Sequence, residues 1–183
     1  MSGFLSQGGG YRSLRVYRLT EVIYDLTFQF TKVYLHCGDR TIDQMVQSAR
    51  SGKQNIAEAS VASQTSRETE IKLTNVARAS LEELLIDYQD YLRVRGYALW
   101  DKQHPRYEQM RAYAKSDALL SEYNTLIERL NVEEFSNLCI TLIHQAQYML
   151  RRLLEVQQQQ FLEQGGIREQ MTRARIDYRK QYQ

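Results

Sequence analysis

Apolar residues recur at alternating steps of three and four along four long segments of the chain. Side chains of a strand alternate with period two, so this spacing predicts helices rather than strands. The first stripe consists of Val16, Leu19, Ile23, Leu26, Phe30 and Val33. The stripe near the far end consists of Phe135, Cys139, Leu142, Ala146, Met149, Leu153 and Val156. We therefore expect an all-α protein.

Capping residues predict where the first three helices begin and end. The first runs over about 14–35 and stops near Gly38. Asp39 or Thr41 can cap the second, which carries the small residues Ala49, Gly52 and Ala59 on one side, where a neighbouring helix could approach closely. Thr65 and Glu68 have the spacing of a capping box for the third, which ends at Gly96.

Over 96–130 the three-and-four spacing of apolar residues is interrupted, which predicts a short helical insertion. We expect helices over about 105–115 and 117–130, with Pro105 at a first helical position. Asn131 and Glu134 predict the start of the fourth long helix, which runs to about 162 and is closed by Gly165–Gly166.

Short connections make the first three helices antiparallel neighbours, so the expected architecture is an antiparallel up-down-up-down four-helix bundle. The fourth helix carries a second stripe, which the insertion or a second subunit could help to cover. That stripe consists of Ile140, Ile143, Leu150, Leu154 and Phe161. The predicted organisation is a flexible lead over 1–12, the bundle over 13–163 and a basic suffix over 164–183, a short helix or a loosely held tail.

The composition indicates one folded domain: the chain has 183 residues, 43% hydrophobic and 25% charged. The first ten residues lack the basic and apolar regions of a signal peptide, and no segment has the length of apolar sequence that crosses a membrane. The two cysteines, Cys37 and Cys139, are too few for a disulfide framework. A cytoplasmic location is the expectation.

The formal net charge is only +2, but the positive charge gathers at the two ends. The N-terminal group consists of Arg12, Arg15 and Arg18, and the C-terminal group of Arg168, Arg173, Arg175, Arg179 and Lys180. Arg50 and Lys53 in the second helix could contact phosphates, although a solvated face balanced by nearby glutamates explains them equally well and is preferred on charge alone. The terminal groups are the stronger candidates, because little acid dilutes them.

Motifs for catalysis or cofactor binding are absent from the sequence. No histidine follows a glutamate at the Glu-x-x-His spacing of di-iron bundles, and no Walker, GxGxxG, HExxH, CxxC or GxSxG motif occurs. His36, Cys37, Cys139 and His144 could meet at one pole of the bundle and offer ligands for zinc. A buried thiol packing as a small hydrophobe is the preferred interpretation of Cys139, so no metal or cofactor is expected.

The stretch 44–59, QMVQSARSGKQNIAEA, with Asn55-Ile56-Ala57-Glu58 at its centre, resembles the second helix of a bacterial family. These are the four helix bundle proteins encoded in intervening sequences of large-subunit ribosomal RNA. The stretch 77–84, ARASLEEL, is similar to their third helix. The longer insertion and the suffix resemble a variant of the family. The usual proline before the Asn-Ile-Ala-Glu segment and the glycine after it are missing here.

The resemblance implies a bundle that assembles into a homo-oligomeric ring, commonly a pentamer, without enzymatic activity. It also implies kinship with the accessory protein of diversity-generating retroelements, which works with a reverse transcriptase and nucleic acid. The motif positions carried over are Asn55, Glu58, Ser80 and Glu83, interpreted here as a satisfied polar network between the second and third helices.

The function expected from these observations is non-enzymatic binding of RNA or a nucleoprotein partner through basic surface. The alternative is a structural or protein-interaction scaffold whose basic ends only solubilise it or dock on an acidic partner. No membrane and no small-molecule substrate is indicated by the sequence.

Overall fold

The computed structural model describes residues 10–181. Helices make up 84% of this range, and it contains no strand, so the all-α prediction is confirmed. The elements are η1 (Tyr11–Ser13), α1 (Arg15–Tyr34), α2 (Arg40–Ala62), α3 (Arg67–Arg95), α4 (Tyr107–Lys115), α5 (Asp117–Glu122), η2 (Tyr123–Thr125), α6 (Leu126–Arg129), α7 (Val132–Gln164) and α8 (Ile167–Gln181).

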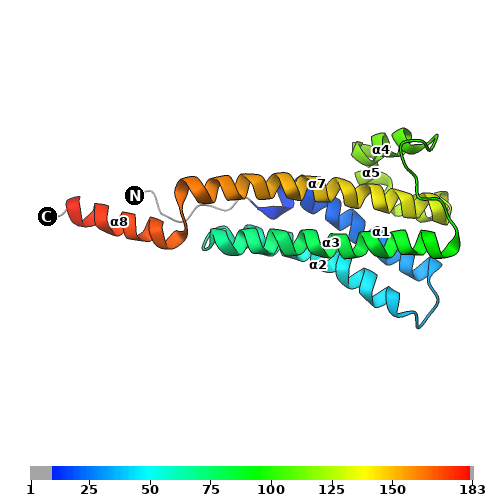
Figure 1. The fold of residues 1–183 in the computed structure, drawn as a ribbon, viewed down its shortest axis with the longest axis horizontal. Coiled ribbons are helices and arrows are strands. Elements are labelled where there is room, and N and C mark those ends of the chain that lie inside the picture. Colours follow the sequence, from blue (N-terminus) through cyan, green and yellow to red (C-terminus); the bar gives the residue numbers. More distant parts are fainter. Residues whose placement is uncertain (1–9, 182–183) are drawn as a thin grey trace.

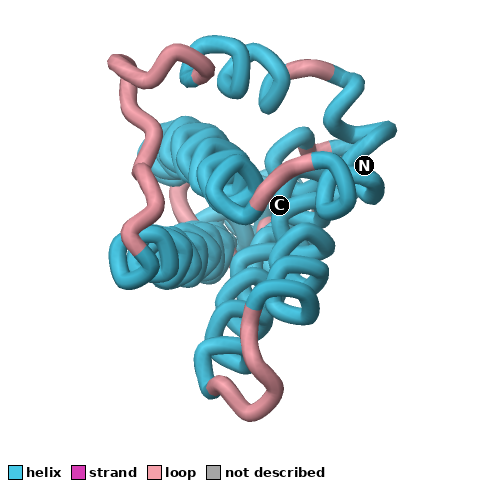
Figure 2. Tube along the Cα trace, turned by 90° about the vertical axis from the view of Figure 1, so that its right-hand side faces the viewer, coloured by secondary structure: helices cyan, strands magenta, loops and turns pink. Residues whose placement is uncertain are grey.

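Four long helices, α1, α2, α3 and α7, form the body of the molecule. Both α1 and α3 contact α2 and α7, so each long helix has two long neighbours. Consecutive long helices run in opposite directions along the longest axis (Figure 1). The connection between α1 and α2 and the short helices α4 and α5 lie on opposite sides of this body (Figure 2).

The helix ends follow the predicted capping chemistry with one exception. Asp39 caps α2 by accepting a hydrogen bond of 2.9 Å from the Thr41 amide, and Asn131 and Glu134 form a capping box at the start of α7. The prediction for α3 is wrong by one residue. Ser66, not Thr65, is its N-cap and accepts from the Thr69 amide at 3.2 Å. Thr65 instead belongs to the turn, where its hydroxyl donates to the Ala62 carbonyl.

An aromatic cluster anchors the core where α1, α3 and α7 meet. The Phe30 ring lies 4.9 Å from Tyr88, 4.8 Å from Tyr91 and 6.1 Å from Phe135 between centroids. The Tyr88 hydroxyl is buried and donates to Thr27 Oγ1 at 3.2 Å. This bond satisfies a polar group that would otherwise destabilise the apolar surroundings.

The core positions predicted for two residues of the stripes are wrong. Val33 and Val156 are 59% and 51% exposed, whereas Thr31 and Leu154 are buried. Both predicted stripes repeat every seven residues, as in a coiled coil. In a straight α-helix with 3.6 residues per turn, side chains seven residues apart differ in direction by about 20°. The last residue of each stripe has therefore rotated away from the core.

The insertion is more broken than the sequence predicts. Pro105 precedes α4 in a turn rather than occupying its first position, and the second predicted helix divides into α5, η2 and α6. The insertion is tied to α1, because the Tyr123 hydroxyl donates to Asp25 at 2.8 Å and Arg15 donates to the Lys115 carbonyl at 2.8 Å.

The two chain ends differ from one another. Most of the predicted lead, residues 1–12, lies outside the described residues, and its last two, Tyr11 and Arg12, form part of η1. The suffix is helical, since Gly165 (φ +72°) ends α7 and α8 follows, extending beyond the long helices (Figure 1). Within residues 10–181, no helix combines the length and the apolarity that a membrane span requires.

Candidate nucleic-acid interface

Two aromatic rings and two lysines form a strip on the face shared by α1 and α2. Tyr24 and Phe28 stack with ring centroids 6.4 Å apart, and Phe28 is 42% exposed. Lys32 Nζ lies 4.2 Å from the Phe28 centroid, and Lys53 Nζ lies 4.3 Å from that of Tyr24. We call these four residues the aromatic–lysine strip.

The spacing of the strip follows from helix geometry. Tyr24, Phe28 and Lys32 are four residues apart on α1, so their side chains lie one above the other. Lys53 comes from the antiparallel neighbour α2 and packs its stem against the ring of Tyr24. Exposed rings can stack on bases of a single strand, and ammonium groups beside them can contact its phosphates.

Charges around the strip are mixed. Arg50 is exposed one helical turn before Lys53. Glu21 lies three residues before Tyr24 on the same face of α1, while Asp25 accepts a hydrogen bond from Tyr123. The strip is therefore positive at its Lys32 end and of mixed charge at its Tyr24 end, where Lys53 and Glu21 both lie.

The three N-terminal arginines have different roles. Arg12 and Arg18 are exposed, and the Arg12 guanidinium lies 5.8 Å from the Tyr11 ring centroid. Arg15 differs, because its guanidinium donates to the Lys115 carbonyl and fastens the end of α4 to α1. The sequence alone does not distinguish Arg15 from Arg12 and Arg18, since a partner 100 positions away leaves no local signal.

The five basic residues of the suffix are all exposed on α8, from Arg168 to Lys180. Arg168, Arg175 and Arg179 are spaced by seven and four residues and therefore lie along one side of the helix, while Arg173 and Lys180 lie on a different side. Figure 1 shows α8 at the end of the long axis, away from the middle of α2 that carries Arg50 and Lys53. The structure thus separates the predicted cations into a group on α8 and a group on η1, α1 and α2.

Polar motif residues do link α2 and α3. The Ser51 and Ser80 hydroxyls share a hydrogen bond of 2.9 Å, and Asn55 donates to Ser51 Oγ at 3.1 Å and to its carbonyl at 2.9 Å. Ser48 donates to Glu83 at 3.3 Å. Three of the four predicted positions therefore belong to this contact.

Glu58 is the exception, because it is exposed on α2 and lies outside this contact. It follows Asn55 by three residues, which turns it by about 60° away from the direction of α3. Gly52 stands at the centre of the same interface. A Cβ at this position would lie 2.8 Å from Leu81 Cδ2, so the absence of a side chain permits the close approach of the helices.

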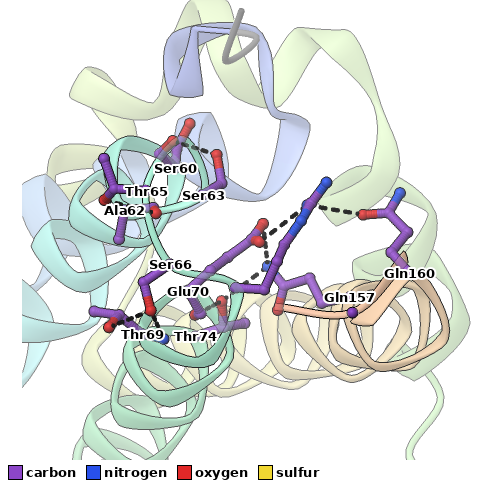
Figure 3. Close-up of polar contacts among 12 residues, drawn as sticks. Ser60, Ala62, Ser63, Thr65, Ser66, Thr69, Glu70, Thr74, Gln157 and Gln160 are labelled. Atoms are coloured by element: carbon purple, nitrogen blue, oxygen red, sulfur yellow. Dashed lines mark hydrogen bonds and ion pairs between the residues drawn. The ribbon is translucent and has the colours of Figure 1, made fainter. Parts of the chain in front are cut away.

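A second polar cluster, between α3 and α7, was not predicted from the sequence (Figure 3). The Gln157 amide donates to Glu70 and to Thr74 Oγ1, both at 3.1 Å. Arg67 pairs with Glu70 at 3.2 Å and donates to Gln160 at 3.0 Å. Glu70 and Gln157 are only 8% and 3% exposed. The one signal in the sequence is Gln157 at a position where the second stripe of α7 would continue.

The proposed zinc ligands do not gather. Cys37 is exposed and Cys139 is fully buried, and within residues 10–181 no three histidine, cysteine or acidic side chains lie close enough to hold a metal. Burial raises the pKa of the Cys139 thiol to about 12, with a smaller opposing effect from its hydrogen bond with Tyr88. The thiol is therefore protonated and packs as part of the core.

Comparison of the chain with protein-family models, with curated proteins and with solved structures finds no match.

Proposed function

We propose that this protein is a non-enzymatic, antiparallel four-helix-bundle protein that binds single-stranded RNA. The contacts of α1 and α3 with both α2 and α7 support the bundle. The similarity of residues 44–59 and 77–84 to the proteins of ribosomal RNA intervening sequences supports a place in that family. A homo-oligomer in the cytoplasm is part of the same proposal.

The aromatic–lysine strip is the observation that carries the RNA-binding proposal. Base stacking on an aromatic side chain contributes about 1–3 kcal/mol per base and tolerates any sequence. Phe28 is 42% exposed, and Lys32 and Lys53 place positive charge beside the rings of Phe28 and Tyr24. The exposed arginines of α8 add sequence-independent attraction for phosphates.

The test is binding of a fluorescent single-stranded oligoribonucleotide to the full chain, followed by anisotropy. Affinity should fall by orders of magnitude between about 50 and 200 mM salt, as expected for several phosphate contacts. Phe28→Ala should weaken binding by roughly tenfold, through loss of one stacked base. Lys53→Gln should weaken it and reduce the salt dependence by about one phosphate contact.

Matched controls lie on other surfaces. Tyr148→Ala removes an exposed aromatic ring of α7 that also has an arginine beside it, and Lys102→Gln removes an exposed lysine of the insertion loop. Neither change should affect binding by more than about twofold. Absence of RNA binding at low salt would favour the scaffold alternative, and equal losses for Tyr148→Ala and Phe28→Ala would exclude the strip as the site.

The oligomeric part of the proposal has an independent measurement. Light scattering at micromolar concentration should give a mass several times that of the 21.6 kDa chain. A monomer under these conditions would contradict the homo-oligomer without bearing on RNA binding.

A further inference from the structure

A cavity of about 260 Å³ lies between the insertion and the first turns of α7. Its apolar lining comes from three places along the chain: Met110 of α4, Leu126 of α6 and Leu138 of α7. Trp100, 8% exposed, completes this lining from the loop before α4. The insertion therefore leaves a partly open cavity against α7 rather than packing flat against it.

Tyr113, one of the residues that line this cavity, has a buried hydroxyl without a hydrogen-bond partner among the residues the structure describes. Buried hydroxyls in folded proteins are nearly always bonded, because an unbonded one has lost water and gained nothing. Burial, followed by the charge of Glu122, raises the pKa of Tyr113, so the hydroxyl keeps its proton and can donate it to an acceptor.

Two arginines also line the cavity and remain partly exposed to solvent. The side chain of Arg106, which pairs with Glu134, is 51% exposed, and that of Arg129, which pairs with Glu122 at 3.5 Å, is 61% exposed. A guanidinium has five N–H donors, and one carboxylate partner leaves several of them available. The cavity thus combines an apolar interior with spare donors.

The volume limits the size of a ligand. A cavity of about 150 Å³ in another protein accommodates benzene, so 260 Å³ corresponds to a molecule of about ten non-hydrogen atoms. The polar groups around the cavity are mostly donors: one hydroxyl and two guanidinium groups can donate, and the Gln109 amide can both donate and accept. They are complementary to an anionic acceptor, and a carboxylate can accept from a guanidinium and a hydroxyl together.

We propose that this cavity binds a small apolar carboxylate, such as a medium-chain fatty acid or an arylalkanoate. The hydrocarbon part occupies the space among Met110, Leu126 and Leu138, and the carboxylate accepts hydrogen bonds from the Tyr113 hydroxyl and Arg129. This site is separate from the aromatic–lysine strip, so it does not depend on RNA binding.

Trp100 makes the proposal directly measurable, since it is the only tryptophan of the chain and lines the cavity. The full chain is titrated with octanoate while Trp100 fluorescence is recorded, and calorimetry measures the heat of binding in parallel. We expect saturation below about 10 mM, the weak limit for a ligand of this size. Octanol, which has the chain without the charge, should bind at least about tenfold more weakly.

Two variants separate binding from folding. Tyr113→Phe should weaken octanoate about tenfold, because it removes a hydrogen bond to a charged group. The ligand-free variant should unfold at the same temperature as the parent or higher, because the lost hydroxyl had no partner. Arg129→Gln should also weaken octanoate, with little effect on octanol.

Controls carry the same changes elsewhere: Tyr148→Phe on α7 and Arg152→Gln, whose arginine is 65% exposed and paired with Glu155. Both should bind octanoate as the parent does. The proposal is overturned if neither fluorescence nor calorimetry saturates with octanoate, if octanol binds equally well, or if Tyr113→Phe leaves the octanoate affinity unchanged.

Discussion

The two ends of the α3–α7 pair are held together by different chemistry. Near the end of α3, Tyr88 and Tyr91 pack with Phe30 of α1 and Phe135 of α7 in an apolar cluster. Near its start, the same two helices meet through a buried polar cluster centred on Glu70 and Gln157. One pair of helices thus uses shape and burial at one end and directed hydrogen bonds at the other.

This difference shows how stability and register can be divided along one interface. Buried aromatic area contributes much free energy but is tolerant of small shifts, because the hydrophobic effect has no direction. A hydrogen bond near 3.1 Å is lost when one helix slides by half a turn relative to the other. The aromatic end therefore supplies most of the stability, and the polar end selects the pairing.

The largest expected effect comes from breaking the aromatic end. Phe135→Ala should lower the free energy of unfolding by about 3–5 kcal/mol, because it leaves a cavity beside Phe30 in a fully buried site. Urea denaturation followed by circular dichroism measures this loss. Phe28→Ala is the matched control: its ring is 42% exposed, so the loss should stay below about 1 kcal/mol.

The next largest effect should come from alkaline pH, which should destabilise the aromatic end of the α3–α7 pair. Burial raises the pKa of Cys139 to about 12 and that of Tyr88 well above its ordinary value, so the folded protein keeps protons that the unfolded chain releases. Stability should be complete below about pH 8.5, where an unfolded thiol is protonated, and should fall above it by about 1.4 kcal/mol per pH unit through Cys139. Above about pH 10, where an unfolded tyrosine also loses its proton, Tyr88 should add a similar slope.

The contribution of Cys139 can be separated by substitution. Denaturation between pH 8.5 and 12 should show a smaller slope for Cys139→Ala than for the parent. Cys37→Ala, which removes an exposed thiol, should leave the slope unchanged. Equal slopes for all three proteins would mean that the Cys139 thiol does not keep its proton in the folded protein, contrary to the prediction.

Disrupting the polar cluster near the start of α3 should have a smaller effect on stability. Glu70→Ala should destabilise the protein by about 2 kcal/mol, because it leaves the buried Gln157 amide with fewer acceptors and Arg67 without its ion pair. Glu68→Ala removes an exposed carboxylate from the same helical turn and should change stability by less than about 1 kcal/mol. Similar losses in both variants would assign the effect to the helix end rather than to the cluster.

The smallest effect on stability is expected when both partners in the polar cluster are replaced by apolar residues. Replacing both partners, Glu70→Leu with Gln157→Leu, should leave stability within about 1 kcal/mol of the parent. The Gln157 amide is then no longer left without an acceptor, and Arg67, which loses its ion pair, keeps its hydrogen bond to Gln160. Hydrogen exchange should nevertheless become faster at the C-terminal end of α7, where register is no longer selected. Unchanged exchange would show that the aromatic end alone determines the pairing.

The local features of the fold could be predicted because their causes are local. Asp39, Asn131 and Gly96 stand within a few positions of the groups that they cap, so the sequence shows both partners together. The candidate interface was predicted less well. Lys53 was identified by its charge alone, and Tyr24, Phe28 and Lys32 were missed although their four-residue spacing is a readable signal.

The amino-acid sequence by itself determined that this protein is helical, where its long helices begin and end, and which residues form most of its core. Only the tertiary structure decided that Val33 turns outward, that Gln157 bonds to Glu70 87 positions earlier, and that the insertion leaves a cavity beside Trp100. Helix formation and capping act over a few residues, whereas a contact between distant segments depends on how whole helices pack, and no pattern along the chain encodes it residue by residue.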